Sequence, residues 1–417
     1  MALVMNTMIF KKEAKLATAS SSLYCSLCRS LYCVFLVLLL TLSTKSIHAQ
    51  TPIEIKIGSI RQIVERPPNL SNLEVIPENE GVAGADISIS DNNTTGQFLG
   101  QQYTLETVNV APDGDILSAY KSLFEKGVRY FVVDAPKASL LALADAGADD
   151  VLFFNASARD DELRTKECRE NVFHIVPSRS MYSDALAQFL VKKRWNKWFL
   201  ITGPREGDKL FADAVRGSAT KFGAKIVEER IWDFGADARR VAQAEVPKLT
   251  QGVKYDVLVV ADEIGTFGEY LMFRTWDARP VAGTQGLAPT TWHKTHEQWG
   301  SAQLQSRFEK RFKRRMTALD YQFWAPIRAI GEGASRTNSG DFDKIAAYLR
   351  NDDFELAGFK GLPLTFRKWN GQLRQPILLA HPASLVSVSP QDGFLHKRSV
   401  LDTLGYDNTD KVCDLTQ

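Results

Sequence analysis

Apolar residues between Ile53 and residue 290 follow two alternating patterns. Short continuous runs of β-branched and aromatic residues predict strands, and they alternate with segments whose apolar residues recur every three or four positions, which predicts helices. Continuous apolar strands between helices are typical of a parallel sheet that is covered on both faces. In the first series the predicted strands are 53–60, 103–110, 129–135 and 150–157, and the clearest predicted helix is 116–127.

The pattern pauses at residues 172–179 and then starts again. The second series predicts strands at 197–203, 224–232, 255–263 and 280–288, and helices at 184–194, 211–223, 240–252 and 266–276. Two series of similar size predict an α/β fold with two doubly wound parallel-sheet lobes. After Trp292 the chain becomes helical, and Asn370-Gly371 then predicts a hairpin.

The first 49 residues read as a secretory signal peptide. Basic residues precede the apolar run Leu31 to Leu42, and Ala49 ends a small-residue cleavage signal. Twelve helical residues would span only ~18 Å, whereas a bilayer core needs ~30 Å, so a membrane anchor is the weaker alternative. We therefore expect the protein in the periplasm.

Charge and cysteine usage agree with export. Residues 1–49 hold five of the 51 Lys and Arg and one of the 49 Asp and Glu. The remaining chain is therefore nearly neutral and has no excess of positive charge that would indicate nucleic-acid binding. One basic segment, residues 307–315, is interpreted as a solvated helix face in preference to a surface that binds an anionic partner.

Cys168 and Cys413 are the two cysteines beyond residue 49, and an oxidising compartment favours a disulfide between them over two thiols.

The sequence contains no recognisable catalytic motif. It lacks a Gly-x-Ser-x-Gly elbow, a phosphate-binding glycine loop and a His-Glu-x-x-His pair. His293, His296 and Glu297 lie close together without a further ligand, so we expect a helix start there and no metal site. We expect no enzyme activity and no cofactor.

Polar residues follow the predicted strands, where ligands of doubly wound sheets bind. Each of these residues can equally be a helix cap or a turn residue, but together they would face one cleft. The candidate ligand-binding residues are Asp134, Ser139, Asn155, Ser157, Arg205, Asp262, Glu263 and Gln285. Trp292, Tyr321 and Trp324 either wall that cleft or pack in the core, and the core is favoured.

The order of elements resembles the type I periplasmic binding proteins of ABC transporters, the branch that contains the branched-chain amino-acid receptors. Three segments, residues 84–101, 170–195 and 389–407, look more narrowly like substrate-binding proteins associated with pyrroloquinoline-quinone-dependent (PQQ-dependent) alcohol dehydrogenase systems. The resemblance implies a monomer that closes on a small organic molecule and delivers it to a permease in the inner membrane.

The resemblance also implies a domain division. Lobe 1 would comprise residues 50–177 and 291–352, lobe 2 residues 178–290 and 353–386, and residues 387–417 would form a tail that returns to lobe 1. Hinges would lie near Pro177–Ser180, Ala288–Trp292 and Asn351–Phe354.

Two departures from the resemblance concern the ligand. In amino-acid receptors the loops matching Ser139 and Ser157 hold the α-carboxylate, and the loop matching Gln285 supplies an acid for the α-ammonium. A neutral amide at Gln285 gives no charge-assisted bond to an ammonium, so either Asp262 or Glu263 compensates or the ligand is not an amino acid. A long loop, Glu65 to Gly81, replaces the usual short glycine-rich turn.

Two other functions remain open at this stage. The same cleft would serve a sensor or accessory protein that partners a signalling receptor or a dehydrogenase. An enzyme on this scaffold would need a nucleophile–base pair or a metal, which the sequence does not assemble.

Overall fold

The computed structural model describes residues 52–64, 76–233, 235, 238–410, 413 and 415. The predicted signal peptide and residues 65–75 of the long loop lie outside this part of the chain. None of the helices formed by the described residues is long and apolar enough to cross a membrane.

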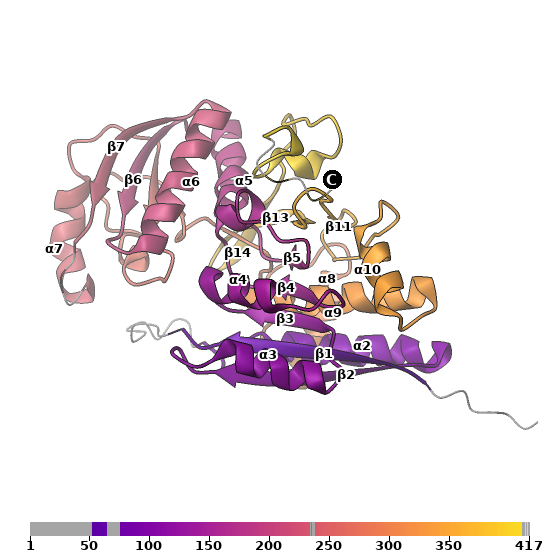
Figure 1. The fold of residues 1–417 in the computed structure, drawn as a ribbon. Helices are drawn as coiled ribbons and strands as arrows, with labels where there is room; N and C mark the ends of the chain where they lie inside the picture. Colours follow the sequence, from indigo (N-terminus) through magenta and orange to yellow (C-terminus); the bar gives the residue numbers. More distant parts are fainter. Residues whose placement is uncertain are drawn as a thin grey trace, which may run out of the picture. The chain divides into compact units, whose positions relative to one another are not determined.

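Sheet A contains five parallel strands in the order β2-β1-β3-β4-β5 (Figure 1). The strands are β1 (Ile53–Gln62), β2 (Gln101–Val110), β3 (Tyr130–Asp134), β4 (Leu152–Asn155) and β5 (Val172–His174). The first four confirm the predicted strands. Helices α3 (Ile116–Glu125) and α4 (Lys137–Ala146) pack on one face, and α2 (Val82–Leu99) and α9 (Ala318–Thr337) pack on the other.

Helix α2 was not expected from the apolar pattern. Its sequence is rich in Ser, Asn, Thr and Gly, and its buried residues include Ser88 and Asn92. These side chains donate hydrogen bonds to backbone carbonyls of α9, at Trp324 and Ile327. Close approach of the two helices requires Gly84, because a Cβ there would lie 1.9 Å from the Asp320 carbonyl oxygen. Polar and small residues at this contact hide the helix from a search for apolar periodicity.

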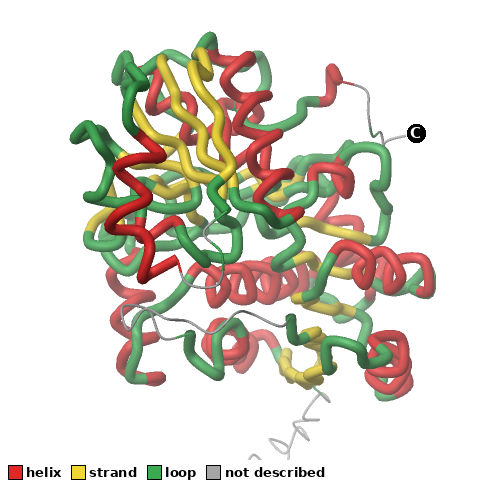
Figure 2. The backbone as a smooth tube through the Cα atoms, turned by 90° about the vertical axis from the view of Figure 1, so that its left-hand side faces the viewer, coloured by secondary structure: helices red, strands yellow, loops and turns green. Residues whose placement is uncertain are grey.

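Sheet B contains four parallel strands in the order β7-β6-β8-β9. They are β6 (Lys197–Thr202), β7 (Lys225–Ile231), β8 (Val257–Ala261) and β9 (Val281–Gly283). Helices α5 (Arg179–Lys192) and α6 (Glu206–Phe222) share one core with this sheet, and α7 (Ala238–Thr250) covers the other face. Figure 2 shows the strands of the fold with helices beside them. The prediction of an α/β fold with parallel sheets in two lobes is confirmed.

The predicted helix at residues 266–276 is wrong. Only a single turn, η2 (Gly268–Tyr270), forms there. The buried carboxylate of Asp262 accepts hydrogen bonds from the backbone N–H groups of Thr266, Phe267 and Gly268, which folds the chain into a tight loop. Phe273, with a φ of 66°, then turns away from a helical path.

The remaining elements complete both lobes. An antiparallel sheet, β10-β13-β14, packs against α5, and the predicted hairpin at Asn370-Gly371 forms between β11 and β12. These elements are β10 (Ala288–Thr290), α8 (Ser301–Phe312), α10 (Phe342–Arg350), β11 (Thr365–Phe366), β12 (Leu373–Arg374), β13 (Ile377–His381), β14 (Ser384–Ser389), and the single-turn helices η1 (Asp161–Arg164), η3 (Val400–Thr403) and η4 (Asn408–Asp410).

The chain passes between the two cores at three places. Ile175 packs in the core of sheet A and Val176 in the core of sheet B, which puts the first crossing beside the predicted hinge at Pro177–Ser180. The second crossing lies between β10, which packs on α5, and the buried Trp292, within the predicted range. The third lies between Leu373 and Ile377.

The hinge expected at Asn351–Phe354 is therefore wrong. Phe354, Leu356 and Leu364 pack in the core of sheet A, and Phe354 stacks on Phe366 at 5.3 Å between ring centroids. Apolar burial thus keeps residues 354–373 with sheet A, although we expected them in lobe 2. The other lobe boundaries stay predictions.

Buried polar side chains join the first and third crossings. Gln375 donates to the carbonyl oxygen of Ile175 at 2.6 Å, and Gln372 donates to the carbonyl of His174 at 3.0 Å. Lys360 is buried and donates to the side-chain oxygen of Gln375 at 2.6 Å and to the carbonyl of Pro376 at 3.2 Å. These contacts satisfy backbone groups that leave regular strands at the crossings.

The chain end is tied down by the predicted disulfide, Cys168–Cys413, which is present with 6.3 Å between the Cα atoms. Before reaching it, the tail contacts lobe 2, where Lys221 donates to the carbonyls of Thr403 and Gly405. The tail therefore touches α6 first and is then fastened near sheet A.

Removal of the disulfide with Cys168→Ser and Cys413→Ser should lower the free energy of unfolding by about 4–5 kcal/mol, because the bridge closes a loop of 245 residues in the unfolded chain. Urea denaturation measures this difference. As a control, a reducing agent should lower the melting temperature of the wild type and leave that of the double variant unchanged. Equal stability of both proteins would contradict the structural role.

Lys360 should make stability depend on pH. Burial lowers the pKa of this amine well below its usual value, so between the folded and unfolded pKa values the unfolded chain binds more protons and stability rises with pH. The wild type should gain up to about 1.4 kcal/mol per pH unit relative to Lys360→Met on going from pH 7 to pH 9. Urea denaturation at both pH values measures this difference in the free energy of unfolding. Lys121→Met, at an exposed position on α3, is the control and should follow the wild type. The same pH dependence in Lys360→Met as in the wild type would contradict the prediction.

Candidate functional site

The carboxyl edge of sheet A carries two of the predicted residues in contact with the end of β1. Asp134, the last residue of β3, forms an ion pair with Arg61 at 3.3 Å. Ser139, in the first turn of α4, donates a hydrogen bond to the side-chain oxygen of Gln62 at 2.5 Å. The neighbours β1 and β3 send their following helices to opposite faces of the sheet. These contacts therefore lie at the switch point, where doubly wound sheets bind ligands.

Asn155 shapes the loop after β4. Its side-chain oxygen accepts from the N–H groups of Ser157 and Ala158, and its amide donates to the carbonyl of Ala158 at 2.8 Å. Burial, reinforced by Arg164, lowers the pKa of His174 well below its usual value, so the neutral ring accepts from the Asn155 amide at Nδ1, 3.1 Å away. With these contacts made and only 1% of its surface exposed, Asn155 orients the loop, while Ser157 is only partly buried.

The same loop is anchored by buried Arg164. Its guanidinium donates to the carbonyls of Ala158 and Asp160, to Val176 at the first crossing, and to the Gln372 side chain, all within 2.9 Å. Burial lowers the pKa of Arg164 to about 10, so the side chain still carries its charge at neutral pH. Arg164 thus fixes residues 158–160 relative to the crossing.

At the carboxyl edge of sheet B, Asp262 has a local structural role. The side chain is 1% exposed and accepts four hydrogen bonds, three from backbone N–H groups and one from the Thr266 hydroxyl. Both oxygens of the Asp262 carboxylate therefore bind groups of their own loop. Gln285 lies against the same loop, since its Cγ is 2.4 Å from where a Cβ on Gly268 would stand.

Glu263 lies beside Arg179 of its own lobe, at the place where residues 159 and 160 of the other lobe approach. Arg179 donates to both oxygens of the Glu263 carboxylate, at 2.9 and 2.7 Å, and contacts Asp160 at 3.0 Å through its remaining nitrogen. Arg159 lies 3.9 Å from Glu263 and over the Tyr182 ring, 5.3 Å from its centroid. We call Arg159, Asp160, Arg179 and Glu263 the crossing cluster, because it joins the loop after β4 in sheet A to the loop after β8 in sheet B.

Sequence reasoning found one member of the crossing cluster and missed three. Arg159 and Asp160 lie two to three residues beyond Ser157, and Arg179 lies in a segment that we interpreted only as a hinge. Their position after a strand and at a helix start was the available signal. Arg205, at the start of α6, is partly exposed, and its backbone N–H donates to Asp208. Within the described residues, neither Arg205 nor Gln285 forms a hydrogen bond or ion pair with the cluster.

The three candidate aromatic walls belong to the core. Trp292, Tyr321 and Trp324 are at most 2% exposed and stack in series, with ring centroids 5.0 and 5.5 Å apart. His296 binds the Phe359 carbonyl through Nε2, and His293 contacts Thr295. In the described part of the chain no three His, Cys, Asp or Glu side chains are grouped to hold a metal ion.

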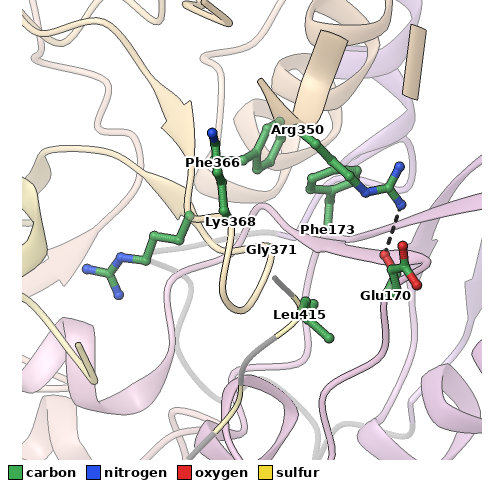
Figure 3. A pocket seen from close by; sticks show the side chains of 8 residues that line it. Glu170, Phe173, Arg350, Phe366, Lys368, Gly371 and Leu415 are labelled. Carbon is green, nitrogen blue, oxygen red and sulfur yellow. Dashed lines mark hydrogen bonds between the residues drawn. The ribbon is translucent and has the colours of Figure 1, made fainter. Parts of the chain in front are cut away.

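Two cavities lie away from the crossing cluster. One, of about 160 Å³, lies between Phe173, Phe366 and Arg350 (Figure 3), where Arg350 donates to the Glu170 carbonyl and Leu415 of the tail forms part of the wall. The other, of about 450 Å³, is an open hollow along α2, beside Arg311. Neither is lined by a predicted ligand-binding residue.

The chain is similar in sequence and in structure to known binding proteins. Residues 76–246 match the family model of the periplasmic binding proteins. A solved branched-chain amino-acid ABC transporter periplasmic ligand-binding protein of Burkholderia xenovorans superposes with a TM-score of 0.64 at 17% identity, covering 80% of this chain and 95% of that one. The chain has the fold of a type I periplasmic binding protein.

Other solved proteins share this fold. A leucine-, isoleucine-, valine-, threonine- and alanine-binding protein of Brucella ovis in a closed conformation has a TM-score of 0.61 at 13% identity, covering 78% of this chain and 89% of that one. A solute-binding protein of R. palustris in complex with benzoate has a TM-score of 0.58 at 14% identity, covering 78% and 92%. A search of curated protein sequences found no match.

Replacing Arg164 should destabilise this periplasmic binding protein fold strongly. Arg164→Met removes the charged donor to the carbonyls of Ala158, Asp160 and Val176 and to the Gln372 side chain, which should lower the free energy of unfolding by about 3–5 kcal/mol. Arg307→Met, which removes an exposed ion pair with Asp91, is the matched control and should cost at most about 1 kcal/mol. Similar losses in both variants, measured by urea denaturation, would show that the Arg164 contacts add nothing specific.

Proposed function

We propose that this protein is the periplasmic substrate-binding component of an ABC transporter and that its two lobes close over a small organic molecule. The crossing cluster is the observation that supports this proposal most directly. Arg179 contacts Asp160 from the loop after β4 and Glu263 from the loop after β8, so the carboxyl-edge loops of the two sheets meet at one place. Ligands of doubly wound sheets bind at such edges.

The proposed mechanism is hinge closure. The chain crosses between the cores three times, and small rotations at these crossings would move one set of loops relative to the other. A ligand favours the closed state only if it binds that state more tightly. The closed state would then be recognised by a permease in the inner membrane, and export by residues 1–49 would bring the protein to the periplasm.

In the proposed site Ser139 and Ser157 would contact the ligand from sheet A, and Glu263 would contribute from sheet B through the crossing cluster. Asn155 and Asp262 would act by holding their loops, because they are buried and bind backbone groups of those loops, and Asp134 would stay paired with Arg61. Arg205 and Gln285 remain candidates at the edge of sheet B. The fold neighbours bind branched-chain amino acids in one case and benzoate in another, so the fold accommodates organic molecules of this size.

The ligand is proposed to be linked to alcohol oxidation. This part of the proposal is supported by the three sequence segments that resemble proteins associated with PQQ-dependent alcohol dehydrogenase systems. The alternative, a sensor or accessory protein, uses the same cleft and differs in its partner.

A screen of alcohols, aldehydes, carboxylic acids and amino acids by thermal unfolding should reveal at least one solute that raises the melting temperature. A ligand at 100 times its dissociation constant stabilises the folded state by about 2.7 kcal/mol. Ser157→Ala should weaken binding of that solute about tenfold, because it removes one hydrogen bond in a desolvated site, whereas Ser90→Ala on partly exposed α2 should not. If no small organic solute stabilises the protein, the proposed function fails.

A further inference from the structure

Recognition of an amino acid requires a carboxylate that is free to accept hydrogen bonds from the ligand's ammonium group. Six of the carboxylates that follow the strands of the two sheets are Asp134, Asp160, Asp161, Asp208, Asp262 and Glu263. The partners of these carboxylates therefore decide which class of solute the site can take.

In lobe 1 each of these carboxylates has a partner among the described residues. Asp134 is paired with Arg61, and Asp160 with Arg179. Asp161 is partly buried and accepts from the backbone N–H of Ser180. None of the three is left for an ammonium group.

In lobe 2 three of the carboxylates likewise have partners. Asp208 accepts from the N–H groups of Arg205 and Glu263, and Asp262 is saturated by its own loop. Glu263 is the only one of the three that reaches the other lobe, and Arg179 already occupies both of its oxygens. An ammonium group would have to displace a bidentate guanidinium, which binds carboxylate more strongly than a single ammonium contact.

Arg159, unlike these carboxylates, has no close ionic partner among the described residues. The side chain of Arg159 is 41% exposed, and its only ionic contact within the described residues is the 3.9 Å approach to Glu263, which is too long for a hydrogen bond. Its backbone is nevertheless held firmly, because its carbonyl accepts from the Arg179 N–H at 2.9 Å and the preceding loop is fixed by Asn155 and Arg164. The guanidinium of Arg159 also lies over the ring of Tyr182.

We infer that the solute bound between the lobes is a small organic carboxylate that lacks an ammonium group, and that Arg159 binds its carboxylate. This inference rests on the proposed function and names the ligand class of the same site. A guanidinium presents two parallel N–H groups that match a carboxylate. The fork of Arg159 is available for such a pair, whereas the two cluster acids beside it, Asp160 and Glu263, are already paired with Arg179. Carboxylic acids are also end products of primary alcohol oxidation, which fits the proposed metabolic link.

The test compares solutes that share one carbon skeleton and differ only in the polar group. One set is 3-phenylpropanoate, 3-phenylpropan-1-ol and phenylalanine, and a second is 4-methylpentanoate, 4-methylpentan-1-ol and leucine. Benzoate and benzyl alcohol form a smaller pair. In titration calorimetry on the full chain purified from the periplasm, at least one carboxylate should bind tenfold or more tightly than its alcohol and its amino acid.

Substitutions test whether Arg159 binds the carboxylate of the solute. Arg159→Gln should weaken binding of that carboxylate at least tenfold and leave binding of the matching alcohol unchanged, while Arg159→Lys should keep part of the affinity. Arg307→Gln, at an exposed ion pair on α8, is the matched control and should bind like the wild type. Arg179→Gln should raise the affinity for the amino acid relative to the carboxylate, because it frees Glu263; if this buried variant does not fold, Arg159→Gln decides alone.

Tighter binding of the amino acid or the alcohol than of the carboxylate in every set would overturn the ligand class. An unchanged carboxylate affinity in Arg159→Gln would overturn the role of Arg159. In both cases a solute still binds, and the proposed function stands. If no solute of any class binds, the proposed function fails first, and the inference falls with it.

Discussion

The architecture depends on how backbone groups are satisfied where the chain leaves one core for the other. At these crossings the strands end, and buried carbonyls lose their sheet partners, which is costly unless side chains replace them. Arg164, Gln372 and Gln375 supply the donors, and they join the first crossing to the third. The two cores are thereby connected by hydrogen bonds between short segments, and the loops at both carboxyl edges keep a defined relation to the crossings.

The crossing cluster is built on this base. Arg164 fixes the loop that presents Arg159 and Asp160, and the start of α5 presents Arg179 beside it. Glu263 reaches the cluster from sheet B because its backbone N–H is held by Asp208. The charged side chains between the lobes are thus placed by buried contacts, and they are paired so that Arg159 keeps an available guanidinium.

The apolar pattern predicted most of the fold, because buried parallel strands are continuous runs of apolar residues. It failed where polar contacts determine the structure. Helix α2 packs through Ser88 and Asn92, and residues 266–276 are folded into a loop by the Asp262 carboxylate. The third crossing was misplaced because apolar residues such as Phe354 do not reveal which core they join. Site prediction located the strand ends, but the pairing of Arg179 with Glu263 joins residues 84 positions apart and leaves no local signal.

In the proposed mechanism the two lobes approach each other when a solute binds between them. Spin labels attached through p-acetylphenylalanine at Lys121 on α3 and Lys209 on α6 would report the distance between the lobes by pulsed electron resonance. We expect a broad or long distance distribution without solute and a shorter, narrower one when a binding solute is added at saturation. A distance distribution that stays the same with and without a solute that calorimetry shows to be bound would contradict hinge closure.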